Sequence, residues 1–374
     1  MDLPLPLVEE VLAGLPLRSL LAVAATSKAL RCLVSSPSFY SLHSRLSCSS
    51  SPWFFFFGHN LLLPHRSQAF AFDPLSFSWL RLPLSPPPPH NSSSLSSSHS
   101  SLFALSGPRQ TRLCIAPSPL KQTWQIIDPP MLIARRKPLV GIFYDDPCKL
   151  DISRIVVAGG VDEDEDEADE LAVEEYNAEK AEWESAEAMP EALRGKRVGA
   201  AMAGGRMYVG EREGGVVCWR GKEGTWREGK VEKPREVEEW EWVGSEDAGL
   251  LAVAACRGGP VKVYSFTLPL DEGEGGRVRE LAEMPAELRR LFQEDGGDEE
   301  GEQVVRVRSC AGGARLLYVY SESPFKEYAA CACELGVEAG ASRWFRLPPM
   351  PSPLHRFDRV SFVSASIALP SCIS

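Results

Sequence analysis

The sequence predicts two unlike parts: a small all-α segment over residues 1–46 and an all-β domain of short strands over residues 47–374. In the first part, apolar residues recur at helical spacing between prolines. From Trp53 onward, short apolar or alternating segments are separated by clusters of glycine, proline and serine, a pattern typical of β-sheet proteins. With 374 residues, 44% of them hydrophobic, the chain is long enough for a small domain and a large repeat domain.

Three short helices are expected in the first part. The first carries Leu7, Val11 and Leu15 on one face. Two more are expected at residues 17–24 and at about 27–34. Pro16 separates the first helix from the second and Pro37 stops the third, because proline cannot continue a helix. Three helices of this size cannot bury all their apolar side chains among themselves. Such surplus apolar surface usually marks a partner interface.

A repeating unit marks the second part. It is a strand that ends in an apolar or aromatic residue, followed by a polar turn and then a tryptophan. It occurs at Phe72–Trp79, Tyr176–Trp183 and Trp219–Trp226, and with two extra residues at Ile115–Trp124. Paired glycines flank several of the neighbouring strands, where tight turns are needed. The spacing of these units suits four-stranded blades, and we expect a β-propeller of about six degenerate blades.

The end of the chain is expected to close this ring. Blade one lacks a clear first strand, and residues 358–367 form an isolated strand pattern. Closure would remove the open sheet edges, so we expect the last strand to complete blade one. One tryptophan recurs per repeat, which favours packing between blades over stacking on a ligand. These residues are Trp79, Trp124, Trp183, Trp226 and Trp344.

Three low-complexity segments are expected to be disordered loops between strands: residues 85–101, 161–170 and 294–302. The first is rich in proline and serine, and the other two are rich in acidic residues. Such compositions bury too little apolar surface to fold alone. A calcium site or a phosphorylation switch is the alternative for these segments, although the second segment lacks the glycine and spacing of a calcium loop.

Composition argues against several functions. The net charge of −11 does not favour nucleic-acid binding, which needs clustered lysine and arginine. No signal-peptide pattern is apparent, and no apolar run is long enough to span a bilayer. We therefore expect a cytoplasmic or nuclear protein with no membrane partner, whose ten scattered cysteines are reduced and buried.

No catalytic, cofactor or metal site is expected. Cys331 and Cys333 are too close in sequence for the usual zinc knuckle. Few of the six histidines fall on expected inner strands, which argues against a copper oxidase built on a propeller. No nucleophile elbow or phosphate-binding loop precedes a helix where one would be needed. The sequence therefore favours a binding protein over an enzyme.

Residues 3–40 resemble the F-box of plant F-box proteins. Residues 3–16, LPLPLVEEVLAGLP, look like the opening helix and turn of that motif. Residues 17–21 look like its second helix, and residues 27–39 look like its closing segment. The sequence departs from the family at Leu30, where members commonly have tryptophan. Leucine buries less area than tryptophan, so weaker adaptor binding is expected.

The rest of the chain resembles kelch repeats, and the combination resembles the plant kelch-domain F-box proteins. This resemblance implies a substrate receptor of an SCF (Skp–cullin–F-box) ubiquitin ligase. The F-box would dock on the Skp-type adaptor and through it on cullin, while the propeller loop face would hold a protein substrate for ubiquitination and proteasomal degradation. Some family members recruit phenylpropanoid and flavonoid enzymes, which suggests that substrate class. The alternative, motivated by Leu30, is a propeller scaffold that binds partners without delivering them for degradation.

The adaptor-binding residues implied by the resemblance are apolar positions of the three helices. The same leucines could instead form the internal core of a helical cap on the propeller. No residue of such a receptor breaks a bond, because the assembly supplies proximity. The predicted contacts are Leu3, Pro4, Leu7, Val8, Val11, Leu12, Leu15, Pro16, Leu20, Leu21, Val23 and Leu30.

Overall fold

The structure is a computed structural model that describes most of residues 4–366. The residues between these limits that it does not describe are 37, 40–41, 44–51, 61, 83–94, 99–100, 107–110, 117–119, 121–123, 147–150, 162–168, 246–247, 258, 269–275, 293–307, 312–314, 325–326, 337–340 and 353.

Three helices with described bounds precede the sheets, as predicted: α1 (Leu5–Ala13), α2 (Leu17–Thr26) and α3 (Lys28–Val34). Residues 38–39 and 42–43 are also helical. Pro4 and Pro16 stand at the N-caps of α1 and α2, where the missing N–H of proline costs no helical hydrogen bond. Ser27 caps α3, and its hydroxyl accepts a hydrogen bond of 3.1 Å from the backbone N–H of Leu30. Local capping chemistry therefore sets where these helices begin.

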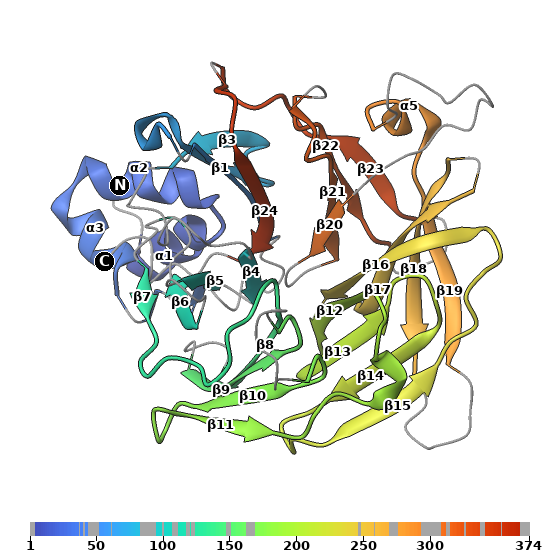
Figure 1. Cartoon of the computed structure of the whole chain (residues 1–374). Coiled ribbons are helices and arrows are strands. Elements are labelled where there is room, and N and C mark those ends of the chain that lie inside the picture. The colour runs from blue at the N-terminus through green and yellow to red at the C-terminus, as the bar shows by residue number, and fades with distance from the viewer. Residues whose placement is uncertain are drawn as a thin grey trace.

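Six four-stranded antiparallel sheets surround a central axis and form a six-bladed propeller, which confirms the predicted fold (Figure 1). From the axis outwards, blade 1 is β24 (Arg359–Ala365), β1 (Trp53–His59), β2 (Gln68–Asp73) and β3 (Ser78–Arg81); blade 2 is β4 (Leu95–Ser98), β5 (Ser101–Ser106), β6 (Arg112–Ala116) and β7 (Gln125–Ile126); blade 3 is β8 (Leu139–Asp146), β9 (Asp151–Ala158), β10 (Val173–Asn177) and β11 (Glu182–Ala186).

The remaining blades follow the same order. Blade 4 is β12 (Val198–Ala203), β13 (Arg206–Glu211), β14 (Val216–Arg220) and β15 (Trp226–Lys230); blade 5 is β16 (Val237–Ser245), β17 (Gly249–Cys256), β18 (Val261–Thr267) and β19 (Arg277–Glu283); blade 6 is β20 (Arg308–Ala311), β21 (Leu316–Tyr320), β22 (Ala330–Glu334) and β23 (Arg343–Arg346). Short helical turns η1 (Pro64–Arg66), η2 (Glu191–Leu193) and α5 (Ala286–Arg289) lie between strands.

The last strand closes the ring, as predicted. β24 pairs antiparallel with β1, with Trp53 opposite Ala365 and Phe55 opposite Val363. Strands from opposite ends of the chain therefore share blade 1. Every inner strand then has an inner strand of the next blade beside it, so the ring leaves no open seam (Figure 1).

The propeller has two faces, named here by their connections. At the crossover face, the outermost strand of each blade leads to the innermost strand of the next, and the second and third strands of each blade are joined. The hairpin face is the other end, where the third and fourth strands are joined, as β2 and β3 are at residues 74–77. Trp53, which pairs with the last residue of β24, lies at the hairpin face. The chain therefore enters the propeller from the helices at this face.

The serine-rich end of the first low-complexity segment is not a loop. Residues 95–98 form β4, the inner strand of blade 2, and Ser101 begins β5. Serine has little strand preference of its own, but pairing with β5 decides the conformation here. Residues 83–94, most of the acidic segment at 161–170 and the whole of 294–302 lie outside the described residues.

Three of the recurring tryptophans tie neighbouring blades together, as predicted. The indole N–H of Trp79 donates to the carbonyl oxygen of Pro348 at 2.7 Å. Trp183 donates in the same way to Pro129, and Trp226 to Glu187, each at 3.0 Å. Each acceptor follows the outermost strand of the preceding blade. A tryptophan that recurs once per repeat therefore makes one contact at each of these three seams between blades.

A buried ion pair fixes the crossover from blade 2 to blade 3. Arg135 and Glu174 have side chains that are 0% and 1% exposed, with Nε and Oε2 3.0 Å apart. Arg135 also donates to the carbonyl oxygens of Gly159 and Ala172, while Glu174 accepts the backbone N–H of Leu132. Burial lowers the pKa of the Arg135 guanidinium, and the Glu174 carboxylate opposes this shift. The pair therefore holds three chain segments together at one point.

The helices share a hydrophobic core with the propeller. Leu12, Leu20 and Val34 are buried in the same cluster as Phe55 of blade 1 and Leu102 of blade 2. The helices accordingly lie at the rim of the ring, between these two blades (Figure 1). The helical segment is therefore held by the propeller at a fixed position.

Thiol accessibility gives a first test of this packing. Cys218 is buried, and desolvation raises its pKa to about 12, whereas Cys32 on α3 is exposed. The thiolate is the reactive form, so we expect iodoacetamide to label Cys32 in the native protein at neutral pH and to leave Cys218 unlabelled until the protein is unfolded. Peptide mass mapping measures both sites. Rapid native labelling of Cys218 would contradict the packing of blade 4.

Candidate partner-binding surfaces

The first surface lies on α1 and α2. Leu5, Leu7, Val11 and Leu21 are exposed by 60%, 48%, 64% and 37%. Leu7 and Val11 are one turn apart on the same face of α1. Ten large apolar side chains are exposed in the described part of the chain, and these four lie within seventeen residues. Such a concentration of exposed apolar side chains is typical of a partner-binding site.

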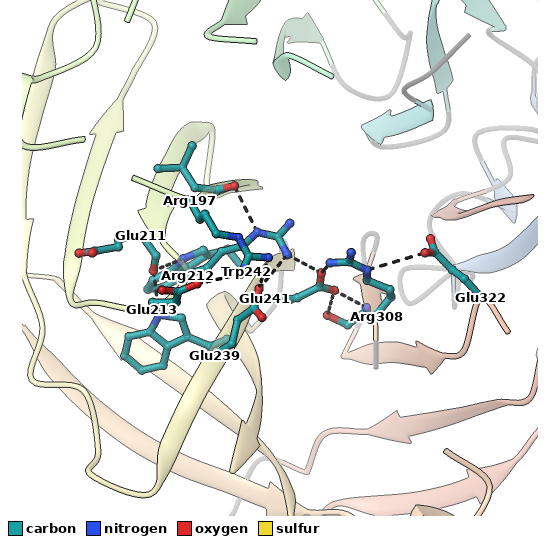
Figure 2. A network of polar contacts seen from close by, with 12 residues as sticks. Arg197, Glu211, Arg212, Glu213, Glu239, Glu241, Trp242, Arg308 and Glu322 are labelled. Atoms are coloured by element: carbon teal, nitrogen blue, oxygen red, sulfur yellow. Dashed lines mark hydrogen bonds and ion pairs between the residues drawn. The ribbon is translucent and has the colours of Figure 1, made fainter. Parts of the chain in front are cut away.

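The second surface is a polar network at the crossover face, around Glu241 of β16 (Figure 2). The Glu241 carboxylate accepts hydrogen bonds from Arg212 at 2.7 Å, from Arg308 at 2.6 Å and from the backbone N–H of Ser309 at 2.7 Å. Arg212 follows β13, and Arg308 begins β20. One carboxylate from blade 5 therefore connects blades 4 and 6.

The network continues to Arg197, which precedes β12 of blade 4, and to Glu213, which follows β13 (Figure 2). Arg197 pairs with Glu213 at 2.8 Å and with Glu239 at 3.3 Å, and Glu239 lies 3.6 Å from Arg212. Next to these ion pairs, the indole N–H of Trp242 donates to the carbonyl oxygen of Glu211 at 3.1 Å. Burial alone would lower the pKa of Arg308, but the adjacent Glu241 carboxylate raises it, so Arg308 stays charged.

The outer members of this network can reach a partner. The side chains of Arg197, Glu213 and Glu322 are 63%, 56% and 48% exposed, whereas that of Glu241 is only 14% exposed. An anchored inner carboxylate thus holds a row of alternating charges at the surface. Charges fixed in this way favour a partner of matching pattern over other proteins.

Glu241 is expected to matter for stability. Replacing it with glutamine leaves Arg212 and Arg308 without their common counter-charge, and we expect the free energy of unfolding to fall by about 2 kcal/mol. Urea denaturation followed by tryptophan fluorescence measures this change. Glu322→Gln is the control, because its carboxylate is half exposed and 3.9 Å from Arg308, and it should have little effect. Equal effects of the two substitutions would contradict the central role of Glu241.

The residues that the structure describes contain no group of three or more histidine, cysteine, aspartate or glutamate side chains placed to hold a metal ion. Among the same residues, no helix has the length and apolar character needed to cross a bilayer. Tyr318 and Tyr320 have raised pKa values because they are buried, which reflects packing in the seam between blades 6 and 1.

Comparison with known proteins finds a domain match and a similar plant protein. Residues 1–42 match the F-box domain. The chain is 31% identical over 220 residues to an F-box/kelch-repeat protein of Arabidopsis thaliana. The N-terminal segment therefore matches an F-box domain, and the chain is similar to a plant F-box/kelch-repeat protein. The aligned region covers 57% of this chain and 51% of the Arabidopsis protein, so the chain spans about half the length of that relative.

Solved structures similar to this chain share little sequence with it. YCF48 from Cyanidioschyzon merolae has a TM-score of 0.40 at 10% identity, covering 80% of this chain and 86% of that one. Virginiamycin B lyase from Staphylococcus aureus has a TM-score of 0.38 at 10% identity, covering 74% and 76%. Similarity at this level does not bear on function.

The structure divides the predicted F-box contacts by exposure. Pro4, Leu7, Val11 and Leu21 are exposed and available to a partner. Leu12 and Leu20 are buried against blades 1 and 2, so they belong to the core of a helical cap and support the exposed surface from beneath. Leu3 lies outside the described residues. The half-buried positions are Val8, Leu15, Pro16, Val23 and Leu30.

Sequence reasoning missed two residues of this surface. Leu5 is 60% exposed but does not share the four-residue spacing of Leu7 and Val11, so counting along one helix face passes over it. Arg18 of α2 donates from Nη1 to the hydroxyl of Ser78 in blade 1 at 3.2 Å. Sixty residues separate these partners, and no local pattern could have shown their contact.

Proposed function

We propose that this chain is a kelch-repeat F-box protein and acts as the substrate receptor of an SCF ubiquitin ligase. In this proposal the F-box binds a Skp-type adaptor and through it cullin, and the propeller binds a protein substrate. The observation that carries the proposal is the exposed apolar surface of α1 and α2, within a segment that matches the F-box domain.

The chemistry of the F-box surface suits a stable adaptor interface. Burying a leucine or valine side chain contributes about 1.5–3 kcal/mol, and Leu7, Val11 and Leu21 offer three such groups on a preformed support. The helices are already fixed by the buried Leu12 and Leu20, so binding does not have to order them. The entropy lost on association is correspondingly smaller.

The crossover face is the proposed substrate site. Its exposed charges, anchored by Glu241, offer a specific pattern to a folded protein. The F-box lies at the rim, and the chain enters the propeller at the hairpin face, so adaptor and substrate could bind together. The receptor itself would transfer no group, because the ligase assembly supplies proximity. The substrate class we propose is an enzyme of phenylpropanoid or flavonoid metabolism, in the cytoplasm or nucleus.

Co-purification with a Skp-type adaptor and cullin tests the ligase role. We expect the full-length protein to bring down both from plant cells, and its substrate to accumulate when the protein is removed. Failure of the wild-type protein to bind the adaptor would contradict the proposal.

A non-degradative propeller scaffold is the second candidate. Leu30 favours it, because this half-buried residue stands where related F-boxes commonly have a larger tryptophan. The two candidates differ in one result: under the scaffold proposal, a bound partner keeps its level when this protein is removed. Pulse–chase measurement of the partner distinguishes them.

A further inference from the structure

An exposed leucine lies beside the F-box, in the turn between β2 and β3. Leu75 is 64% exposed at the hairpin face. The turn is held by Asp73, whose buried carboxylate accepts hydrogen bonds from the backbone N–H of Leu75 at 3.0 Å and from the Ser76 hydroxyl at 2.7 Å. This turn is therefore rigid, and Leu75 projects to solvent from a fixed position.

This turn is continuous with the F-box surface. Arg18 of α2 donates to the Ser78 hydroxyl, which is itself 2.8 Å from the Ser76 hydroxyl. Arg18 and Leu21 are neighbours on α2, three residues apart. A connected path therefore runs from exposed Leu21 through Arg18 and the two serines to exposed Leu75.

The two parts of this path are held together from beneath. Leu80 of β3 and Phe55 of β1 pack in the same hydrophobic cluster as Leu17 and Leu20 of α2. The turn and α2 are thus attached to one core and present a single preformed surface. A surface of this kind loses little conformational entropy on binding.

We propose that the Skp-type adaptor contacts blade 1 through Leu75 in addition to the F-box helices, an inference that rests on the function proposed above. A stable interface takes about 20–30 residues on each side, and one face of three short helices cannot supply that number. The surface that continues directly from the exposed helix face is the turn that carries Leu75. Phe77 is a poor probe of it, because its ring packs toward blade 6 against Phe345.

Calorimetric titration of the purified full-length protein with a Skp-type adaptor tests this proposal. We expect Leu75→Glu to weaken binding about tenfold, because it places a charge in an apolar contact. The matched control is Leu132→Glu, because Leu132 is 63% exposed but lies in the crossover from blade 2 to blade 3. This control should bind like the wild type.

The outcomes separate this inference from the proposed function. Wild-type affinity for Leu75→Glu would overturn the contact with blade 1 and leave the ligase role intact. No binding by the wild-type protein would overturn both. Leu75→Ser serves as a second variant that adds no charge, and an unchanged thermal midpoint in either variant shows that any loss of affinity arises at the interface.

Discussion

The double substitution Leu7→Ala/Val11→Ala is expected to lower adaptor affinity by about 100-fold while the propeller stays folded. The two side chains are exposed and lie on one face of α1. Central apolar residues of a protein interface typically contribute more than 1 kcal/mol each to the binding free energy. A loss of about 2.7 kcal/mol from the two side chains together corresponds to a 100-fold lower affinity. Calorimetric titration with the adaptor measures it, and thermal denaturation checks the fold.

The control for this experiment is Leu62→Ala/Leu132→Ala. These leucines are 88% and 63% exposed, and both lie at the crossover face. Leu15 is less suitable for the test, because it is half-buried against the core shared with blades 1 and 2 and its loss would also disturb packing. If the α1 variant and the control bind the adaptor equally well, the exposed face of α1 is not the docking site.

Glu174→Ala is expected to lower the free energy of unfolding by about 3–5 kcal/mol. The substitution leaves Arg135, whose side chain is 0% exposed, as a charge without its partner, and such a charge is costly in a buried site. It also removes the acceptor of the Leu132 backbone N–H. Urea denaturation should show a much lower midpoint, because the pair stabilises the connection between blades 2 and 3.

Glu184→Ala is the matched control. Glu184 also belongs to blade 3, but its ion pair with Lys180 is between side chains that are 53% and 58% exposed. Water screens such a pair, so the midpoint should stay at the wild-type value. Replacing Arg135 with methionine and Glu174 with leucine together should recover part of the stability, because no unpaired charge then remains. An unchanged midpoint in Glu174→Ala alone would contradict the buried pair.

The sequence alone was enough to predict the two parts of the chain, the three helices, the six blades and the closing role of the last strand. These features depend on local signals: prolines that end helices, the serine that caps α3, and a tryptophan that recurs once per blade. A repeat also determines its own neighbours, since each blade must bury its faces against the next. Trp79 and Trp183 could therefore be assigned to the seams between blades before their acceptors were known.

The tertiary structure decided which F-box leucines are exposed, because helical spacing is the same for a residue that faces a partner and one that faces the propeller. Leu7 and Leu20 have the same side chain, yet they are 48% and 0% exposed, since blades 1 and 2 cover only one of them. The joining of blades 4 and 6 through Glu241 and the contact of Arg18 with Ser78 also depend on residues far apart in sequence. Periodicity reports the faces of an element, and only packing decides what covers each face.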